Sequence, residues 1–543
     1  MTRWSQLSTR RRPARADAPR PERGSRRAPG WRGLASGGLS GLLAAAVALG
    51  VAELIAGITG PLGSPVVAVG GAAIDMTPIP VKDFAIVHFG SHDKTALISG
   101  IFVLLAIFAV VIGVLARRWL AAGLAGLTIF GALGVSAALT RPTAGATDVL
   151  PTLAGIAAGM AALILLIQVG TPDTAPHGEA DADQSPRVVP GRRRFLAAGA
   201  GMVVVAAAAG AGGDLLLRRF SATTARNQVR LPAAARAVPA LPAGAKLDVS
   251  GISSFYTPNN SFYRVDTDLV LPQVSPDQWT LRISGMVDRP VELSFADLLR
   301  QPLTEADITL VCVSNEVGGP YAGNARWLGA SLPALLRRAG LRSGADQVLS
   351  TSVDGMTIST PVSAIMDGRN ALLAVGMNGQ PLPIAHGFPA RMVVPGLYGY
   401  TSATKWVTKL KLTTFAAQKA YWTQRGYAAQ APIKTESRID VPKPLSQVPK
   451  GQVAVAGVAW APHRGISAVE VSVDNGAWHE ARLAAADGID TWRQCVWNWD
   501  ATPGLHQLQA RATDGTGATQ TSSRTGVFPN GATGWDSVVV TVT

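Results

Sequence analysis

Cysteine, histidine and charge are scarce in this chain. Its 543 residues include 2 cysteines and 7 histidines, and only 15% are charged. Two cysteines cannot build a disulfide framework, and the C-x-x-C-H pattern of a covalently attached haem is missing. Because the long apolar segments hold no histidine, a haem bound between paired histidines inside a helical bundle is not expected.

Positive charge is concentrated at the start of the chain. The formal net charge is +14, and residues 1–33 hold ten arginines against Asp17 and Glu22. Basic and aromatic residues do not alternate on any folded segment, which argues against a nucleic-acid partner. Residues 1–34 are therefore predicted to be a basic cytoplasmic tail that flanks a membrane segment.

Five apolar segments are long enough to cross a lipid bilayer, which takes about 20 residues. Core helices of soluble proteins seldom run this long without a charge. Residues 35–213 are thus predicted to form a transmembrane α-helical bundle that associates with membrane lipid. The segments are Ala35–Ile58, Ala96–Ala116, Trp119–Leu139, Val149–Val169 and Phe195–Gly213, with the shorter Val66–Ile74 expected at the membrane interface.

Basic residues between the segments predict the orientation. The tail, Arg117-Arg118 and Arg192-Arg193-Arg194 all fall on one side if the five segments cross. The positive-inside rule places that side in the cytoplasm and everything after the fifth segment outside the cell membrane. Glu53, near the outer end of the first segment, is interpreted as a solvated edge residue.

The remaining residues divide into three parts. Residues 214–248, rich in Ala, Arg and Pro, predict a linker. Residues 249–431 mix strand and helix patterns and predict an α+β domain. Residues 432–543 alternate apolar and polar positions between D-N-G, D-G and P-G turns, which predicts an immunoglobulin-like β-sandwich.

Cys312 lies at a junction that suits ligand binding. Ile308–Val313 is a short apolar run typical of a buried strand, and Ser314–Asn324 is rich in Gly, Asn and Pro and predicts a loop. Ser331 is then the expected N-cap of a helix to Ala339. A lone cysteine can instead be a small core residue, as we expect for Cys495.

Two stretches resemble the sulfite oxidase family of molybdopterin oxidoreductases. In that family a strand-end Cys is followed by a Gly/Asn loop and an A-R-W element, as in Cys312 to Trp327. The longer match is MNGQPLPIAHGFPARMVVP at Met377–Pro395, followed by Gly399 and Lys405. The resemblance implies a molybdenum ion held by a molybdopterin dithiolene and by the thiolate of Cys312, a ligand that suits a redox-active metal.

The same resemblance implies which residues contact the cofactor. Histidine, arginine, serine and lysine supply fixed donors to the pterin and its phosphate. The alternative interpretation of Asn259–Arg264 is a surface turn. The alternative interpretation of Asp354 is a D-G hairpin turn. The implied contacts are Asn259, Asn260, Phe262, Tyr263, Arg264, Asp354, His386, Arg391, Ser402, Ala403, Thr404 and Lys405.

Tyr427 is the second implied catalytic residue. It ends the stretch YWTQRGY, which is similar to the family pattern that carries an active-site tyrosine. A phenol beside an oxo ligand can donate a hydrogen bond and share in proton movement. The alternative is a buried aromatic residue in a domain interface.

The fifth segment begins GRRRFLAAGAG, which resembles the twin-arginine export signal. A plain positive-inside flank is the alternative. Export of a folded protein fits an enzyme that receives its cofactor in the cytoplasm, and without an evident cleavage site the segment is expected to remain as an anchor.

Together these features predict a membrane-anchored, extracytoplasmic oxidoreductase that performs two-electron oxygen-atom transfer on a small molecule. One departure matters: sulfite oxidases have an Arg shortly after the metal cysteine, where this chain has Ser314, Asn315, Glu316 and Val317. Two alternatives therefore stay open: a methionine-sulfoxide-type reductase with a membrane electron donor, and a non-catalytic surface protein. The electron partner is not identified, and the resemblance implies a homodimer through the C-terminal domain.

Overall fold

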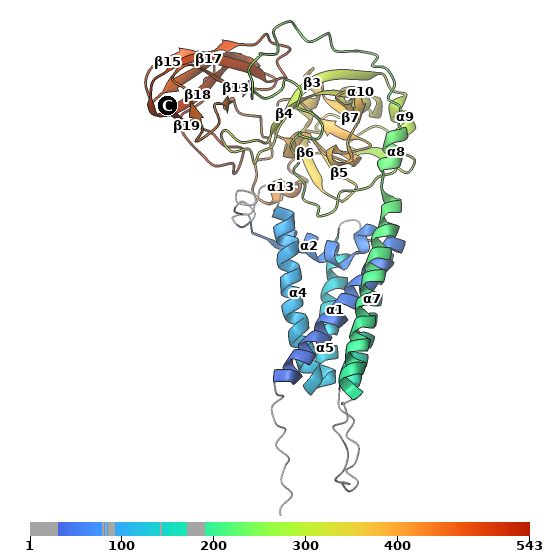
Figure 1. Ribbon diagram of the computed structural model, residues 1–543. Helices are drawn as coiled ribbons and strands as arrows, with labels where there is room; N and C mark the ends of the chain where they lie inside the picture. The colour runs from blue at the N-terminus through green and yellow to red at the C-terminus, as the bar shows by residue number, and fades with distance from the viewer. Residues whose placement is uncertain (1–30, 79–80, 82–83, 85–92, 142–143, 171–189) are drawn as a thin grey trace, which may run out of the picture.

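The computed structural model describes residues 31–78, 81, 84, 93–141, 144–170 and 190–543. Figure 1 shows a bundle of long helices below two β-rich regions that lie side by side at one end of it. The central region covers residues 249–431 and the C-terminal region residues 432–543. Residues 1–30 of the predicted basic tail lie outside the described residues.

Within the described residues, five helices of the bundle are long and apolar enough to span a membrane. This confirms the five predicted segments as helices, with ends that shift by a few residues. Helix α1 crosses the bundle and packs against α4, α6 and α7 (Figure 1). The helices are α1 (Trp31–Thr59), α4 (Asp93–Arg118), α5 (Leu120–Leu139), α6 (Leu150–Gly170) and α7 (Pro190–Leu217).

The short helix α2 (Pro65–Met76) connects the bundle to the central region. It follows the turn η1 (Pro61–Gly63) and lies beneath the β-rich regions in Figure 1. Asp75 in this helix pairs with Arg141 at 3.0 Å and accepts a hydrogen bond of 2.8 Å from the Tyr421 hydroxyl group. The apolar segment too short to span therefore joins two parts of the molecule.

Residues 214–248 are more ordered than the predicted linker. Helix α7 runs on through the turn η4 (Arg218–Phe220) into α8 (Thr223–Gln228). Arg226 then donates hydrogen bonds of 2.7 Å to the carbonyl oxygens of Pro381 and Leu382, and Arg236 forms a bridge with Thr304. The linker prediction is wrong in this respect, because arginine side chains and backbone groups attach the segment to the central region.

The central region contains two five-stranded sheets. The first has the order β2-β1-β10-β5-β6, with β2 (Val291–Ser294), β1 (Thr280–Gly285), β10 (Val407–Thr413), β5 (Gln347–Ser352) and β6 (Thr357–Pro361). The second has the order β3-β4-β7-β8 with β9 beside β7: β3 (Leu303–Val311), β4 (Ala322–Ser331), β7 (Leu372–Met377), β8 (Gln380–Pro381) and β9 (Arg391–Val393).

Short helices cap the ends of these strands. The Ser331 hydroxyl group accepts a hydrogen bond from the Ala334 backbone at 3.4 Å, so the predicted N-cap is confirmed, and Ser294 forms a capping box with Asp297. The helices are α9 (Phe295–Leu299), α10 (Leu332–Ala339), α11 (Val362–Met366), η5 (Ile384–His386), α12 (Gly399–Ser402) and α13 (Tyr421–Gln424).

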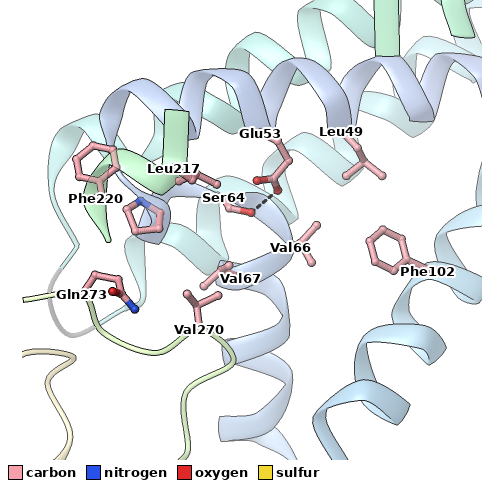
Figure 2. A pocket seen from close by; sticks show the side chains of 11 residues that line it. Leu49, Glu53, Ser64, Val66, Val67, Phe102, Leu217, Phe220, Val270 and Gln273 are labelled. Atoms are coloured by element: carbon pink, nitrogen blue, oxygen red, sulfur yellow. Dashed lines mark hydrogen bonds between the residues drawn. The ribbon is translucent and has the colours of Figure 1, made fainter. Parts of the chain in front are cut away.

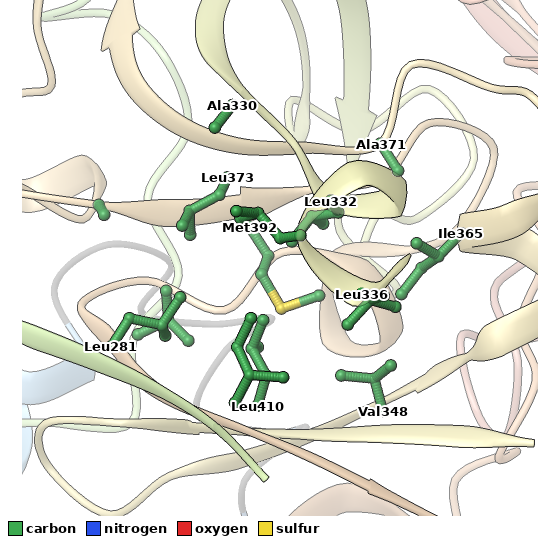
Figure 3. Close-up of a cluster of buried hydrophobic side chains, with 14 of the residues drawn as sticks. Leu281, Ala330, Leu332, Leu336, Val348, Ile365, Ala371, Leu373, Met392 and Leu410 are labelled. Atoms are coloured by element: carbon green, nitrogen blue, oxygen red, sulfur yellow. The ribbon is translucent and has the colours of Figure 1, made fainter. Parts of the chain in front are cut away.

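The core of the central region lies between the two sheets. Figure 3 shows Met392 from one sheet pointing toward Leu281, Leu410 and Val348 of the other, with Leu336 of α10 beside them. These side chains are buried, and burying each contributes about 1.5–3 kcal/mol. The packing of Met392 in the core therefore fixes the position of β9, whose first residue is Arg391.

The C-terminal region is a sandwich of two sheets around its own apolar core. Its Cys495 is a buried free thiol, as predicted. The immunoglobulin-like assignment stays a prediction. One sheet holds β11 (Glu436–Val441), β13 (Gly451–Trp460), β17 (Arg493–Ala501) and β16 (Arg482–Leu483), and the other holds β12 (Gln447–Val448), β19 (Asp536–Val542), β18 (Gly504–Asp514), β14 (Ile466–Val473) and β15 (Trp478–Glu480).

Candidate functional site

Cys312 is the first residue after β3 and is buried. Its backbone N–H donates to the Tyr321 carbonyl oxygen at 2.9 Å, which closes the loop between β3 and β4. The backbone N–H of Ser314 points at the sulfur at 3.4 Å. Burial raises the pKa of the thiol, and the contact with Ser314 opposes that rise. A positive ion beside the sulfur would favour the thiolate more strongly than the Ser314 contact does.

The predicted cofactor segment Asn259–Arg264 lies against β4. The Phe262 ring is buried beside Gly323, where an added Cβ would come within 2.7 Å of the ring. Tyr263 stacks on Phe262, and its hydroxyl group reaches Gly399 of α12. Burial raises the pKa of Tyr263, and the nearby Cys312 adds to the effect. Two predicted residues are thus brought to the Cys312 loop.

The two asparagines of this segment differ. Asn259 accepts a hydrogen bond of 2.9 Å from the Asn378 side chain, and its amide donates to the Met377 carbonyl oxygen at 3.3 Å. Asn260 is exposed, and its side chain accepts a hydrogen bond of 3.2 Å from the hydroxyl group of the neighbouring Ser261. Asn259 therefore ties the segment to the β7–β8 turn, while Asn260 has the surface-turn environment of the alternative interpretation.

His386 and Arg391 are buried next to each other. Arg391 donates to the carbonyl oxygens of His386 at 3.1 Å and Ala403 at 3.4 Å, and its guanidinium lies 5.1 Å from the centre of the Trp327 ring. Burial lowers the pKa of Arg391 to about 10. Burial and the Arg391 charge lower the pKa of His386 to about 4, so its imidazole is neutral at pH 7. Its Nε2 lies 3.1 Å from the Asn259 carbonyl oxygen.

The stretch Ser402–Lys405 surrounds Arg391, but its hydroxyl groups are used within the fold. Ser402 donates to the Leu397 carbonyl oxygen at 2.9 Å, and Thr404 shares a hydrogen bond of 2.5 Å with Ser350. Ala403 offers its carbonyl oxygen to Arg391. These residues shape the site through the backbone more than through free side-chain donors.

Asp266 is a charged residue of this site that the motif comparison did not single out. Its side chain is only 1% exposed and pairs with both Lys405 and Arg264, the latter at 3.2 Å. Lys405 also donates to the Val265 carbonyl oxygen at 3.2 Å. The two predicted phosphate-binding cations therefore share one internal counter-ion. The stretch TPNNSFYRVDT contains this acid, but no spacing rule connects it to Lys405.

Asp354 lies at the β5–β6 turn, next to Gly355 with φ +86°. Its carboxylate accepts a hydrogen bond of 2.9 Å from the Met356 backbone, as expected of a hairpin-turn residue. It also faces Asp268, whose pKa is raised by burial and by this second carboxyl group. The contacts of Asp354 thus fit its alternative, structural interpretation, and a role in pterin binding stays a prediction.

Tyr427 lies in an aromatic cluster between the central and C-terminal regions. Its ring contacts Tyr400, Trp422 and Phe528 at centroid distances of 5.5, 5.3 and 5.2 Å. The same cluster includes Val311 and Val313, the neighbours of Cys312. Tyr427 therefore lies in a domain interface, as its alternative interpretation expects, next to the strand that precedes Cys312. Its catalytic role stays a prediction.

The C-terminal region also reaches the Cys312 loop. Arg438 of β11 donates to the Gly319 carbonyl oxygen at 2.9 Å and pairs with Asp440 at 2.9 Å. Glu436, two residues earlier, is buried; burial raises its pKa to about 8, while the Asn315 amide and nearby Lys434 lower it. Sequence patterns gave no signal for either residue, because both act across a domain boundary.

The donor set fits an anionic, pterin-type ligand. Arg391 is a buried cation, and no Asp or Glu of the described residues lies within ion-pair distance of it. The guanidinium nitrogens of Arg391 donate to backbone carbonyl oxygens, which do not neutralise its charge, whereas an anionic group such as a phosphate would do so. His386 is neutral and lies beside Arg391, and Tyr263 lies within electrostatic reach of both Arg391 and the Cys312 thiol. These residues suit the group that the family resemblance implies.

The chain is similar to several proteins of one family. The family model described as the oxidoreductase molybdopterin binding domain matches residues 268–422. Mitochondrial sulfite oxidase of Rattus norvegicus is 31% identical over 289 residues, which are 45% of this chain and 52% of that relative. An uncharacterized oxidoreductase of Bacillus subtilis is 33% identical over 150 residues, 28% of this chain and 72% of that relative.

One solved structure with a related sequence is that of the sulfane dehydrogenase SoxCD from Paracoccus pantotrophus. It has 25% identity and a TM-score of 0.47, and the match covers 54% of this chain and 84% of that chain. The chain spans about half the length of the first curated sulfite oxidases it matches. On the molybdopterin-binding match and the curated relatives, the chain belongs to the sulfite oxidase family of molybdenum- and molybdopterin-dependent oxidoreductases.

Proposed function

We propose that this protein is a membrane-anchored, extracytoplasmic oxidoreductase that catalyses two-electron oxygen-atom transfer at a molybdenum ion bound by Cys312. The observation that carries the proposal is that the buried Tyr263 lies within electrostatic reach of both Cys312, the buried thiol at the end of β3, and Arg391, a buried cation without an acidic partner among the described residues. A core cysteine alone would need no such arrangement. A molybdopterin needs both a sulfur ligand for its metal and a cation for its phosphate.

The bound group would supply the change of oxidation state and the transferable oxygen atom, and the protein's residues would position it. Cys312 would add the protein thiolate. Arg391 would give a forked pair of donors to the phosphate. His386 would remain neutral at pH 7, since burial and Arg391 disfavour its charged form, and its hydrogen bond to Asn259 would fix the ring in one orientation.

Holoprotein purified from membranes tests this proposal. Wild type is expected to contain molybdenum and pterin in equal amounts, and Cys312→Ser should lose the metal-to-protein sulfur bond and turnover. Cys495→Ser is the matched control, because Cys495 is also a buried free thiol but belongs to the C-terminal core. Protein that folds without molybdenum or pterin would support the non-catalytic alternative instead.

A sulfoxide reductase is the second candidate function. The residues from Val313 to Tyr321 include no Lys or Arg, and Glu316 in this loop is exposed. A dianion such as sulfite would find no cation in the loop, whereas a neutral sulfoxide needs none. Turnover of sulfite with an artificial electron acceptor, compared with reduction of methionine sulfoxide by a reduced viologen dye, distinguishes the two reactions. Activity with sulfite alone would eliminate this candidate.

We further infer that the cytoplasmic end of the bundle is the one opposite the β-rich regions. Arg117 lies at that end, where it donates to the Gly170 carbonyl oxygen at 2.9 Å. Helix α4 ends at Arg118, and Arg193 lies in the first turn of α7; Figure 1 shows the end of α4 and the start of α7 on the side of the bundle opposite the β-rich regions. The positive-inside rule supports an extracytoplasmic site. The twin-arginine role of Arg192-Arg193 and a homodimer through the C-terminal region stay predictions, tested by export in strains that lack the twin-arginine pathway and by light scattering.

A further inference from the structure

A cavity of about 380 Å³ lies where the helical bundle meets the central region. Its wall combines α1, α2, α4 and the end of α7 with the segment Val270–Gln273, and Figure 2 shows these side chains around one space. Its lining is mostly apolar, as in pockets that bind small molecules at domain boundaries. The apolar side chains include Leu49, Val66, Val67, Phe102 and Leu217.

The depth of the cavity limits what can enter it. Helix α1 ends at Thr59 and α7 at Leu217, so the cavity lies at the end of the spanning segments nearest the central region. Phe102, on the lipid-facing side of α4, is 44% exposed. A molecule dissolved in the bilayer can therefore reach the cavity with its polar end near the membrane surface and its apolar end in lipid.

One ionisable side chain faces the cavity. Glu53 of α1 accepts a hydrogen bond of 2.5 Å from Ser64 through Oε1, as Figure 2 shows, and among the described residues no hydrogen-bond donor reaches Oε2. This corrects the interpretation of Glu53 as a plain solvated edge residue. Ionisable groups within spanning helices usually mark a binding or transfer site, because they are costly to keep there.

An apolar cavity that contains one carboxyl group restricts the class of ligand that fits. A lipid acyl chain would fill the apolar space but leave the Glu53 oxygen without a donor. A flat aromatic ring with hydroxyl groups and an isoprenoid tail would place its faces on Val66, Val67 and Phe102 and donate an O–H to Glu53. The proposed function also requires a two-electron partner that the matched molybdopterin-binding segment does not supply, and hydroquinones carry two electrons and two protons.

We propose that this cavity binds the head group of an isoprenoid hydroquinone or quinone, with Glu53 accepting a phenolic O–H. The redox part of the inference rests on the proposed function; the binding part does not. The balance closes in both directions: a hydroquinone and a sulfoxide give a quinone, a thioether and water, and a quinone, sulfite and water give a hydroquinone and sulfate.

Photolabelling of the full-length holoprotein in lipid nanodiscs tests the site. The probe is a short-tail azidoquinone, and the labelled peptides are mapped by mass spectrometry. We expect saturable labelling of Glu53–Val67 and of the peptide that contains Val270. Val67→Trp fills the cavity and should reduce labelling at least about tenfold, the loss expected when a buried ligand is displaced. Val103→Trp is the matched control, because the Val103 side chain is 59% exposed on the outer face of α4.

Glu53→Gln tests the polar contact without changing the size of the side chain. The apparent Kd for a reduced short-tail hydroquinone should rise about tenfold or more, as for the loss of a hydrogen bond to a charged group. Molybdenum and pterin loading verifies that each variant folds. Cys312→Ser should keep wild-type labelling, so a failed metal assignment and a failed quinone site give different results.

Equal labelling of the Val67→Trp and Val103→Trp variants would overturn the proposal. So would saturable labelling of the cavity by a photoreactive phosphatidylcholine that excess quinone does not displace, because the cavity would then be a lipid site.

Discussion

The helical bundle and the central region bury opposite kinds of side chain. In the bundle, glycine and alanine lie between helices: a Cβ at Gly41 would overlap the Ala109 carbonyl oxygen, and one at Gly155 would lie 2.5 Å from that of Ala48. Large apolar residues face outward, with Ile129 61% exposed. In the central region the buried side chains are large, such as Trp279 and Trp327.

A bilayer around the bundle would account for the difference. Lipid is as apolar as leucine, so helices in a bilayer gain little by hiding leucine and associate through close backbone packing instead. The central region gains from removing large side chains from water, at about 25 cal/mol for each Å² of apolar surface. This contrast supports the membrane assignment independently of helix length, and substitutions can test each half of it.

The largest expected effect is on the close packing of the bundle. Gly113→Leu would place a side chain against the Gly37 carbonyl oxygen and the Gly41 backbone, because α1 and α4 touch there. We expect a loss of about 3 kcal/mol or more in bundle stability, since overpacking of backbone contacts cannot relax. Thermal unfolding in detergent measures it.

Gly100→Leu on the same helix is the control for this prediction, because no atom lies within 4 Å of a Cβ there. If Gly100→Leu and Gly113→Leu destabilise the protein equally, close helix packing is not what holds the bundle together.

The second prediction concerns the buried cation of the central region. Arg391→Met should lower retention of molybdopterin at least about tenfold, because it removes the charged donors to the phosphate. The cofactor-free protein should lose little stability, since relief of the unpaired buried charge offsets the loss of the donors to the carbonyl oxygens of His386 and Ala403. Pterin fluorescence after gel filtration and thermal unfolding of both forms provide the measurements. A large destabilisation of the cofactor-free protein would show that Arg391 is structural.

Arg326→Met is the contrasting variant. Arg326 pairs with the buried Asp307 at 2.7 Å, so its removal leaves an uncompensated carboxylate. It should destabilise the protein with and without cofactor, unlike Arg391→Met.

The third prediction is a pH dependence of stability. Burial raises the pKa of Glu436 to about 8 in the folded protein, above the ordinary value of 4.5. The folded state therefore binds more protons than the unfolded state between these values, and stability falls as pH rises from about 4.5 to about 8. Glu436→Gln should flatten this part of the profile, as measured by thermal unfolding between pH 5 and pH 9. An unchanged slope would contradict the burial argument.

The smallest expected effect is at the α9 cap. Ser294→Ala removes the hydrogen bond of 3.1 Å that the hydroxyl group accepts from the Asp297 backbone, and should cost about 1 kcal/mol in urea unfolding. Ser294→Gly should cost only a few tenths of a kcal/mol, because glycine adopts the cap conformation readily. Equal losses in both variants would show that the capping bond is not responsible.

Local patterns predicted the parts of the fold that depend on neighbouring residues. The five long helices, the strand before Cys312, the N-cap at Ser331 and the turn at Gly355 follow from hydropathy, capping and turn chemistry in short windows. The motif at Met377–Pro395 placed His386 and Arg391, which the structure brings together.

Contacts between distant parts of the sequence could not be predicted in this way. Asp266 meets Lys405, Arg438 meets Gly319 and Arg226 meets Pro381 only because the sheets and the sandwich place them there. The same holds for Glu53, whose cavity requires Val270 of the central region. A polar residue's partner depends on tertiary packing, whereas its own helix or turn depends on its neighbours.

The most direct test of the central claim is X-ray absorption at the molybdenum edge on purified holoprotein. The account predicts that Cys312→Ser replaces one molybdenum–sulfur distance by a molybdenum–oxygen distance, or loses the metal, while Cys495→Ser leaves the spectrum unchanged. An unchanged spectrum in fully pterin-loaded Cys312→Ser would contradict it.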